Sequence, residues 1–169
     1  MPALYLMRHA KSDWHSAAQA DFDRPLNQRG SKDAARMGEW LKQQNITPSL
    51  VLSSPAQRAR QTVLAVADTL GMKESEVVFN KELYLADRAT LLNILRTVPA
   101  ATENVMLVAH NPGLDNLVEW LAPDPPPLSE SGKLMTTAAI AMFKVPGGWS
   151  RLKRGGLVLQ QLQRPRDLP

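Results

Sequence analysis

The chain has 169 residues, of which 44% are hydrophobic and 21% are charged, proportions that are ordinary for a soluble globular protein. A chain of this length can bury most of its apolar surface in one core, so we expect a single domain over residues 1–169. No stretch approaches the roughly 20 apolar residues of a membrane helix, and the lack of cysteine excludes disulfides and thiolate chemistry. Because no targeting pattern is visible either, we predict a cytoplasmic protein with no membrane association.

The net charge of +4 is concentrated at the C-terminal end of the chain. Residues 150–169 contain five basic residues and one acidic residue, whereas residues 1–149 contain equal numbers of each. A neutral body argues against nucleic-acid binding, and the four scattered tryptophans lack the interleaved basic residues of a nucleic-acid platform. We interpret the basic end as a solvated surface, with a docking surface for an acidic protein partner as the alternative.

Short apolar runs alternate with segments of helical period, a pattern that is typical of an α/β sheet covered on both faces. In chain order, strands are predicted over 3–7, 50–52, 77–79, 105–109, 136–145 and 157–162, with the last two as a hairpin. Helices are predicted over 27–45, from about 55 to 70, through 91–98 and over 112–121. The proline-rich stretch 123–133 is predicted to form one exposed loop.

Three of the predicted helices begin at favourable capping residues. Asn27, Ser54 and Asn111 are suitable N-caps because their side chains can accept a hydrogen bond from the first helical turn. Pro55 and Pro112 suit the first helical position, where the missing N–H leaves no hydrogen bond unmade. Two of these helices are therefore expected to start directly after a strand.

Polar residues that can do chemistry follow three of the predicted strands. They are Arg8-His9, Ser53-Ser54 with Arg58 in the next helix, and His110-Asn111. Ligands of open α/β sheets bind outside the carboxyl ends of the strands, so we expect these three sets to converge.

Two arginines, two histidines and a helix N-terminus describe a pocket for a dianionic phosphoryl group. The guanidinium groups of Arg8 and Arg58 supply paired donors that stay charged at working pH. A neutral imidazole is a competent nucleophile toward phosphorus, and a backbone carbonyl bonded to one nitrogen of His9 would fix the reactive tautomer. Metal binding is not expected, because the histidines lack paired ligand spacing and the arginines would repel a cation.

Several segments resemble the histidine phosphatase superfamily. The segment 6–12, LMRHAKS, is similar to its Arg-His-Gly signature, 53–62, SSPAQRARQT, to its arginine-bearing second segment, and 108–112, VAHNP, to its third. The segments 23–26, DRPL, and 29–30, RG, also resemble the family. Within the superfamily, the Arg-His-Ala-Lys-Ser sequence and the short chain resemble the SixA-type phosphohistidine phosphatases most.

This resemblance implies a three-layer α/β/α sandwich with a mostly parallel central sheet, of the phosphoglycerate-mutase-like kind. It also implies that His9 is the nucleophile and forms a covalent phosphohistidine, while Arg8, Arg58 and His110 form the phosphate pocket. Substrate contacts are expected from four further residues, namely Lys11, Ser12, His15 and Asn111.

The general acid is not fixed by any motif. Glu82 lies near the position where relatives carry theirs, and Asp87 competes with it. An alkoxide leaving group needs a proton, which contributes ~10²–10⁴ in rate, whereas the P–N bond of a phosphohistidine is labile. A site without a clearly positioned general acid therefore favours a phosphohistidine substrate. The short loops suit a phosphorylated side chain that a protein presents.

The favoured hypothesis is a phosphohistidine phosphatase that acts on a phosphorylated protein, such as a histidine phosphotransfer domain, and needs no cofactor. One alternative is a phosphomonoesterase that acts on small phosphate esters. Another is a module that binds phosphorylated protein without turnover.

Overall fold

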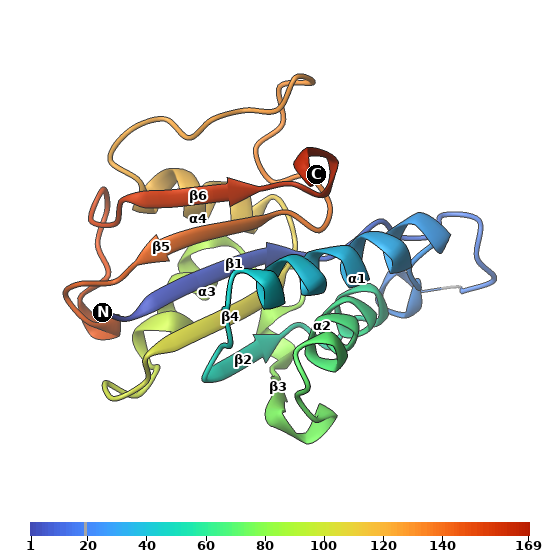
Figure 1. The fold of residues 1–169 in the computed structure, drawn as a ribbon, viewed down its shortest axis with the longest axis horizontal. Coiled ribbons are helices and arrows are strands. Elements are labelled where there is room, and N and C mark those ends of the chain that lie inside the picture. The colour runs from blue at the N-terminus through green and yellow to red at the C-terminus, as the bar shows by residue number, and fades with distance from the viewer. Residues whose placement is uncertain (19) are drawn as a thin grey trace.

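The protein forms a six-stranded sheet with the order β3-β2-β4-β1-β5-β6 in a computed structural model that describes residues 1–18 and 20–169 (Figure 1). Strands β1, β2, β3 and β4 are mutually parallel, β5 is antiparallel to β1, and β6 is antiparallel to β5. The bounds are β1 (Ala3–Arg8), β2 (Leu50–Ser53), β3 (Val77–Phe79), β4 (Asn104–Ala109), β5 (Ile140–Lys144) and β6 (Leu159–Gln163). The predicted mostly parallel sheet is confirmed.

Helices cover both faces of this sheet (Figure 1). Helices α1 (Gln28–Gln43) and α2 (Gln57–Thr69) pack together on one face, and α3 (Arg88–Arg96) and α4 (Gly113–Leu121) pack together on the other. Alternation along β1 explains the two cores, because successive side chains of a strand point to opposite faces. Leu4 and Leu6 belong to the core under α3 and α4, whereas Tyr5 and Met7 belong to the core under α1 and α2. The chain therefore has the three layers that the sequence predicts.

The N-terminus of α1 is capped as expected, since the Asn27 side chain accepts a hydrogen bond of 2.8 Å from the N–H of Gly30. The predicted start of α2 is wrong by two residues, because the helix begins at Gln57 with Ala56 as its N-cap. The Ser54 hydroxyl accepts from the N–H of Ala56 at 3.3 Å and therefore closes a turn before the helix. Arg58 still lies in the first turn.

The predicted capping of α4 is also wrong in detail. The helix begins at Gly113, and its N-cap is Pro112 rather than Asn111. The Asn111 side chain accepts from the N–H of Asp115 at 3.2 Å and donates to the carbonyl of Met135 at 3.2 Å. Asn111 thus joins the start of α4 to the segment that precedes β5.

The strand predicted over 136–145 begins only at Ile140. Ala138 has a φ of 64° and its N–H lies 3.1 Å from the carbonyl oxygens of both Arg8 and His9. The Arg8 N–H in turn donates to the carbonyl of Ala139 at 3.1 Å. The residues before β5 therefore fold against the end of β1 instead of extending the strand.

The two C-terminal strands form the predicted antiparallel pair, although a connection that contains η4 (Trp149–Arg151) replaces a tight turn between them. Because β6 runs antiparallel to β5, it ends at the same edge of the sheet as β1 (Figure 1). The C-terminus thus lies close to the carboxyl ends of the parallel strands. No helix in the described part of the chain is long and apolar enough to cross a membrane.

Candidate active site

The carboxyl ends of β1, β2 and β4 bring the three predicted residue sets together. Arg8 pairs with Ala109 and Ser53 with Val108, so the residues that follow these positions leave the sheet at one level. The ring centroids of His9 and His110 lie 5.1 Å apart. The expected convergence of strand ends is therefore present in the structure.

His9 is held in one tautomer by its own backbone neighbour. Its Nδ1 lies 2.7 Å from the carbonyl oxygen of Ala10, which can only accept, so Nδ1 carries the proton and Nε2 keeps its lone pair. Burial lowers the pKa of His9 to about 4, and the charges of Arg58, Arg8 and Arg24 act in the same direction. The imidazole is therefore neutral near pH 7.

His110 lies beside His9 and contacts the strand end of β2. Its Nε2 is 2.7 Å from the Ser54 hydroxyl, which joins two of the predicted residue sets directly. Burial lowers the pKa of His110 to about 3, and the neighbouring His9 and Arg58 act in the same direction. Two buried, neutral imidazoles thus adjoin each other among fixed guanidinium charges.

The two arginines of the predicted pocket are anchored from opposite sides. Arg8 donates from one terminal nitrogen to the carbonyl of Met135 at 3.0 Å. Arg58, 2% exposed, donates to the Asp21 carbonyl at 2.8 Å and to its carboxylate at 3.0 Å. These contacts restrict the orientation of each guanidinium group before any ligand binds.

Three buried side-chain nitrogens in the described residues have no hydrogen-bond partner. They are Nε of Arg8, Nε of Arg58 and Nδ1 of His110. Buried polar groups are normally hydrogen-bonded, so a cluster of unpartnered nitrogens points to a ligand that accepts hydrogen bonds. All three belong to the residues that the sequence assigns to the phosphate pocket.

Asp21, in η1 (Asp21–Asp23), is a central residue of the site that sequence reasoning missed. Its carboxylate accepts from Arg24 at 2.6 Å, Arg58 at 3.0 Å and the Tyr84 hydroxyl at 2.5 Å. Although burial raises the pKa of Asp21, these hydrogen bonds lower it to about 2. A carboxylate that stays ionised therefore holds two arginines in place.

Arg24 and Tyr84 were also missed as site residues. Arg24 donates from Nε to the Ser12 hydroxyl at 3.0 Å and lies 3.6 Å from the centroid of the exposed Trp14 ring. The Tyr84 ring stands edge-on to His110 with centroids 5.6 Å apart. The family-like segment 23–26 was a signal for Arg24, whereas no pattern marked Asp21 or Tyr84.

The other four residues that the sequence predicts for the site differ in their burial and in their contacts. Ser12 is buried, and its hydroxyl accepts a hydrogen bond from Arg24. Lys11 is exposed and lines the same cavity as Arg8. His15 is exposed, and its backbone N–H donates to Asp13. Asn111 binds the Met135 carbonyl, as Arg8 does.

The two candidate acids differ in what they contact. Asp87 caps α3, where it accepts from the N–H of Thr90 at 2.9 Å, and this hydrogen bond lowers the pKa of its carboxyl group. A carboxyl group whose pKa is lowered is ionised near neutral pH and therefore has no proton to donate. Glu82 is exposed in η3 (Lys81–Leu83), two residues before Tyr84, and its carboxylate has no hydrogen bond within the described residues. Glu82 therefore stays the better candidate on position.

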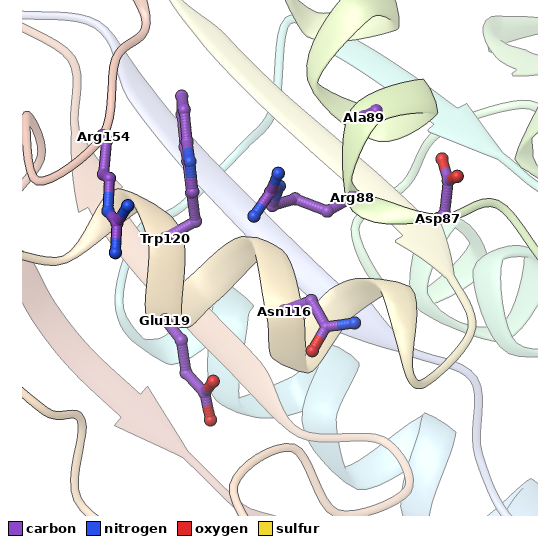
Figure 2. A pocket seen from close by; sticks show the side chains of 7 residues that line it. All are labelled: Asp87, Arg88, Ala89, Asn116, Glu119, Trp120 and Arg154. Atoms are coloured by element: carbon purple, nitrogen blue, oxygen red, sulfur yellow. The ribbon is translucent and has the colours of Figure 1, made fainter.

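A hollow lies between α3 and α4, and Asp87 is one of the residues that line it (Figure 2). It has a volume of about 400 Å³, and its lining includes Arg88, Arg154 and the Trp120 ring, which lies between them in the view of Figure 2. Asp87 and Glu119 balance the two arginines. This hollow contains none of the predicted phosphate ligands. Across residues 1–18 and 20–169, no group of three or more histidine and acidic side chains is arranged to hold a metal ion.

Similarity to known proteins assigns the chain that carries these site residues to a family. A model of the histidine phosphatase superfamily (branch 1) matches residues 4–84. SixA of Escherichia coli K12, a phosphohistidine phosphatase, is 30% identical over 82% of this chain and 82% of its own length. The chain belongs to the histidine phosphatase superfamily.

The similarity within this superfamily extends beyond the N-terminal motifs. A solved structure of the protein histidine phosphatase SixA in complex with tungstate is 27% identical, covers 99% of both chains and has a TM-score of 0.80. An uncharacterized chloroplastic protein of Arabidopsis thaliana is 32% identical over 92% of this chain and 76% of its own length. The chain is thus a SixA-like histidine phosphatase in sequence and fold, which confirms the resemblance drawn from residues 6–12, 53–62 and 108–112.

Proposed function

We propose that the chain, as one histidine phosphatase domain over residues 1–169, removes the phosphoryl group from a phosphohistidine side chain of a protein through a covalent intermediate on His9. The observation that carries this proposal is the neutral Nε2 of His9, which is free to attack because Nδ1 donates to Ala10. A buried nucleophile beside Arg8, Arg58 and His110 suits phosphoryl transfer, which depends on positioning and electrostatic stabilisation.

In the first step, the lone pair of Nε2 forms a bond to phosphorus while the P–N bond of the substrate breaks. The electron pair of that bond stays on the ring nitrogen of the substrate histidine. When the other ring nitrogen of that histidine carries a proton, the substrate side chain leaves as a neutral imidazole. In the second step, a water oxygen attacks phosphorus, the bond to Nε2 breaks and inorganic phosphate leaves, with the water proton passing to phosphate or solvent. His9 returns to its neutral form.

Arg8, Arg58 and His110 are the proposed ligands of the phosphoryl oxygens. Their unpartnered buried nitrogens supply donors in a site where water is largely excluded, so charge that spreads over the oxygens is stabilised strongly. The tungstate bound to the SixA relative is a tetrahedral oxyanion, as phosphate is, which supports an oxyanion pocket in this fold. Lys11, Ser12, His15 and Asn111 remain proposed substrate contacts.

Glu82 is the proposed proton donor for leaving groups that leave as alkoxides. Its exposed carboxyl group has no fixed hydrogen bond in the described structure, so we infer that it assists ester cleavage weakly. A phosphohistidine needs less help, since its imidazole leaves readily. The substrate proposal agrees with the name of the E. coli relative, and a phosphorylated protein is the proposed partner. No cofactor is part of the proposed mechanism, and a cytoplasmic location remains a prediction.

The test compares a phosphohistidine peptide with an aryl phosphate ester as substrates. Wild-type protein should cleave the peptide with the higher kcat/KM, and His9→Ala should cleave neither. Because Glu82 assists weakly, Glu82→Gln should lower both turnover rates by less than about 3-fold, whereas a loss of about 10²-fold on an ester with an alkoxide leaving group would favour a phosphomonoesterase. Glu39→Gln, on the exposed side of α1, is the matched control and should change neither rate. A higher kcat/KM for the ester would instead favour a phosphomonoesterase.

A further inference from the structure

A cavity of about 710 Å³ adjoins the proposed phosphate pocket, and the two share Arg8 as a wall residue. We call it the basic cavity, because six cationic side chains line it against three acidic ones. The cationic side chains are those of Arg8, Lys11, Arg29, Lys133, Arg164 and Arg166. None of its lining residues is aromatic. Its lining is therefore that of a site for anions.

The topology of the sheet explains why C-terminal charges reach this cavity. Gln163 at the end of β6 pairs with Ile140, which pairs in turn with Met7 of β1. Arg164 and Arg166 therefore follow β6 at the edge where Arg8 ends β1. The other C-terminal cations lie in the connection before β6, where Arg154 lines the hollow of Figure 2 and Arg151 and Lys153 line a separate hollow. Only Arg164 and Arg166 of the C-terminal cations therefore line the basic cavity.

The cations of the basic cavity are not equally available to a ligand. Arg164 is buried and donates to the carbonyls of Pro127 at 2.7 Å and Leu134 at 3.1 Å, so it anchors the loop that borders the cavity. Arg29 lies 3.6 Å from the buried Asp33. Both side chains are partly satisfied by the protein itself.

Lys11, Lys133 and Arg166 are the available cations. All three are exposed, and their side chains make no ion pair or hydrogen bond with any residue in the described part of the chain. They come from three segments that are distant in sequence, namely the segment after β1, the loop before β5 and η5 (Pro165–Asp167). Three unpaired positive charges therefore surround one cavity next to His9.

We propose that the basic cavity binds acidic side chains that flank the phosphorylated residue of the protein substrate. This inference rests on the proposed function, because it assumes that a polypeptide presents the phosphoryl group. A phosphoryl group held by Arg8 and His9 places the adjacent substrate chain at the mouth of the cavity, where carboxylates meet Lys11, Lys133 and Arg166. The charge of the cavity thus selects among phosphoproteins.

The expected size of this selection follows from the exposure of the cations. An exposed ion pair changes the affinity of a complex by about 1.5- to 5-fold, so two or three together change kcat/KM by about 10-fold. Screening at high salt should weaken the effect, because the charges are in contact with solvent. The preference should therefore be clear at low ionic strength and small near 1 M salt.

The experiment measures kcat/KM for three peptides that carry one phosphohistidine flanked by glutamate, glutamine or lysine. The wild type should prefer the glutamate peptide to the glutamine peptide by about 10-fold and discriminate further against the lysine peptide. In the double variant Lys133→Gln/Arg166→Gln, the ratio of kcat/KM for the glutamate and glutamine peptides should fall to near 1. In the control Arg151→Gln/Lys153→Gln, which removes the same charge from the connection before β6, the ratio should stay near 10.

Equal kcat/KM for the three peptides in the wild type would overturn the inference while leaving the proposed function intact. An equal loss of preference in the control double variant would also overturn it, since net charge rather than the cavity would then decide. If no phosphohistidine peptide is cleaved although an aryl phosphate is, the proposed substrate class is wrong and the inference falls with it.

Discussion

Asp21 binds Arg58 twice, through its backbone carbonyl at 2.8 Å and through its carboxylate at 3.0 Å. The same carboxylate binds Arg24 and Tyr84, so one acidic residue connects η1 to α2 and to the residue after η3. A carboxylate on an arginine that is proposed to bind phosphate has two opposite effects. It orients the guanidinium group, and it offsets part of the positive charge that attracts the substrate.

Asp21→Asn separates these effects, because asparagine keeps an oxygen acceptor and the backbone contact but removes the negative charge. We expect inhibition by tungstate to become about 3- to 10-fold tighter, since a negative charge in contact with Arg58, a proposed ligand of the anion, is lost. The measurement is the inhibition constant against an aryl phosphate at fixed salt. Weaker inhibition in Asp21→Asn would show that orientation of Arg58 outweighs the repulsion.

The buried histidines predict how stability depends on pH. The pKa of His9 is about 4 in the folded protein and about 6.5 when unfolded, so between these values only the unfolded chain gains the proton. The free energy of unfolding should therefore fall as the pH falls from about 6.5 to 4, by up to about 3 kcal/mol from His9. His110, with a pKa of about 3, acts in the same direction.

Urea unfolding at pH 7 and pH 4.5 measures this dependence. His9→Asn should lose less stability than the wild type between the two pH values, whereas His15→Asn, at an exposed position, should match the wild type. An identical loss in His9→Asn and the wild type would contradict the assigned pKa of His9.

Gly30 in α1 lies against the segment that follows His9. A Cβ atom at this position would be 2.1 Å from the carbonyl oxygen of Lys11, which also accepts from the N–H of Asn27. Gly30→Ala should therefore destabilise the protein by about 2 kcal/mol, although alanine is normally the better helix residue. Thermal unfolding should show the loss, and Ser31→Ala, its exposed neighbour, should leave the melting temperature within about 2 °C. A more stable Gly30→Ala would contradict the described contact.

The strand ends of the site could be predicted because they have a local signature. The runs before Arg8 and His110 are short and apolar, and polar residues follow them abruptly, so their meeting at one edge follows from parallel pairing. Asp21 and Tyr84 have no such signature, because their contact joins residues 63 apart, one in the short 3-10 segment η1 and the other directly after η3, and neither segment has a period. The helix starts near Ser54 and Asn111 were misplaced because both side chains bind tertiary partners. Local capping preferences did not contain that information.

The basic C-terminal end shows the same limit. Its net charge is visible in the sequence, whereas the position of Arg164 and Arg166 in the basic cavity, apart from the cations before β6, depends on the direction of β6. The sequence therefore shows which residues carry the charge but not where these residues lie in the fold.

The proposed mechanism requires Nε2 of His9 to carry the phosphoryl group during turnover. Protein mixed with a phosphohistidine peptide and quenched in alkali within milliseconds should contain a phosphoryl group on His9, which mass spectrometry of the digested chain can locate. This phosphoryl group should be lost in acid and should be absent from the His9→Ala variant. A label on another residue, or rapid phosphate release with no labelled chain at any time, would contradict the mechanism.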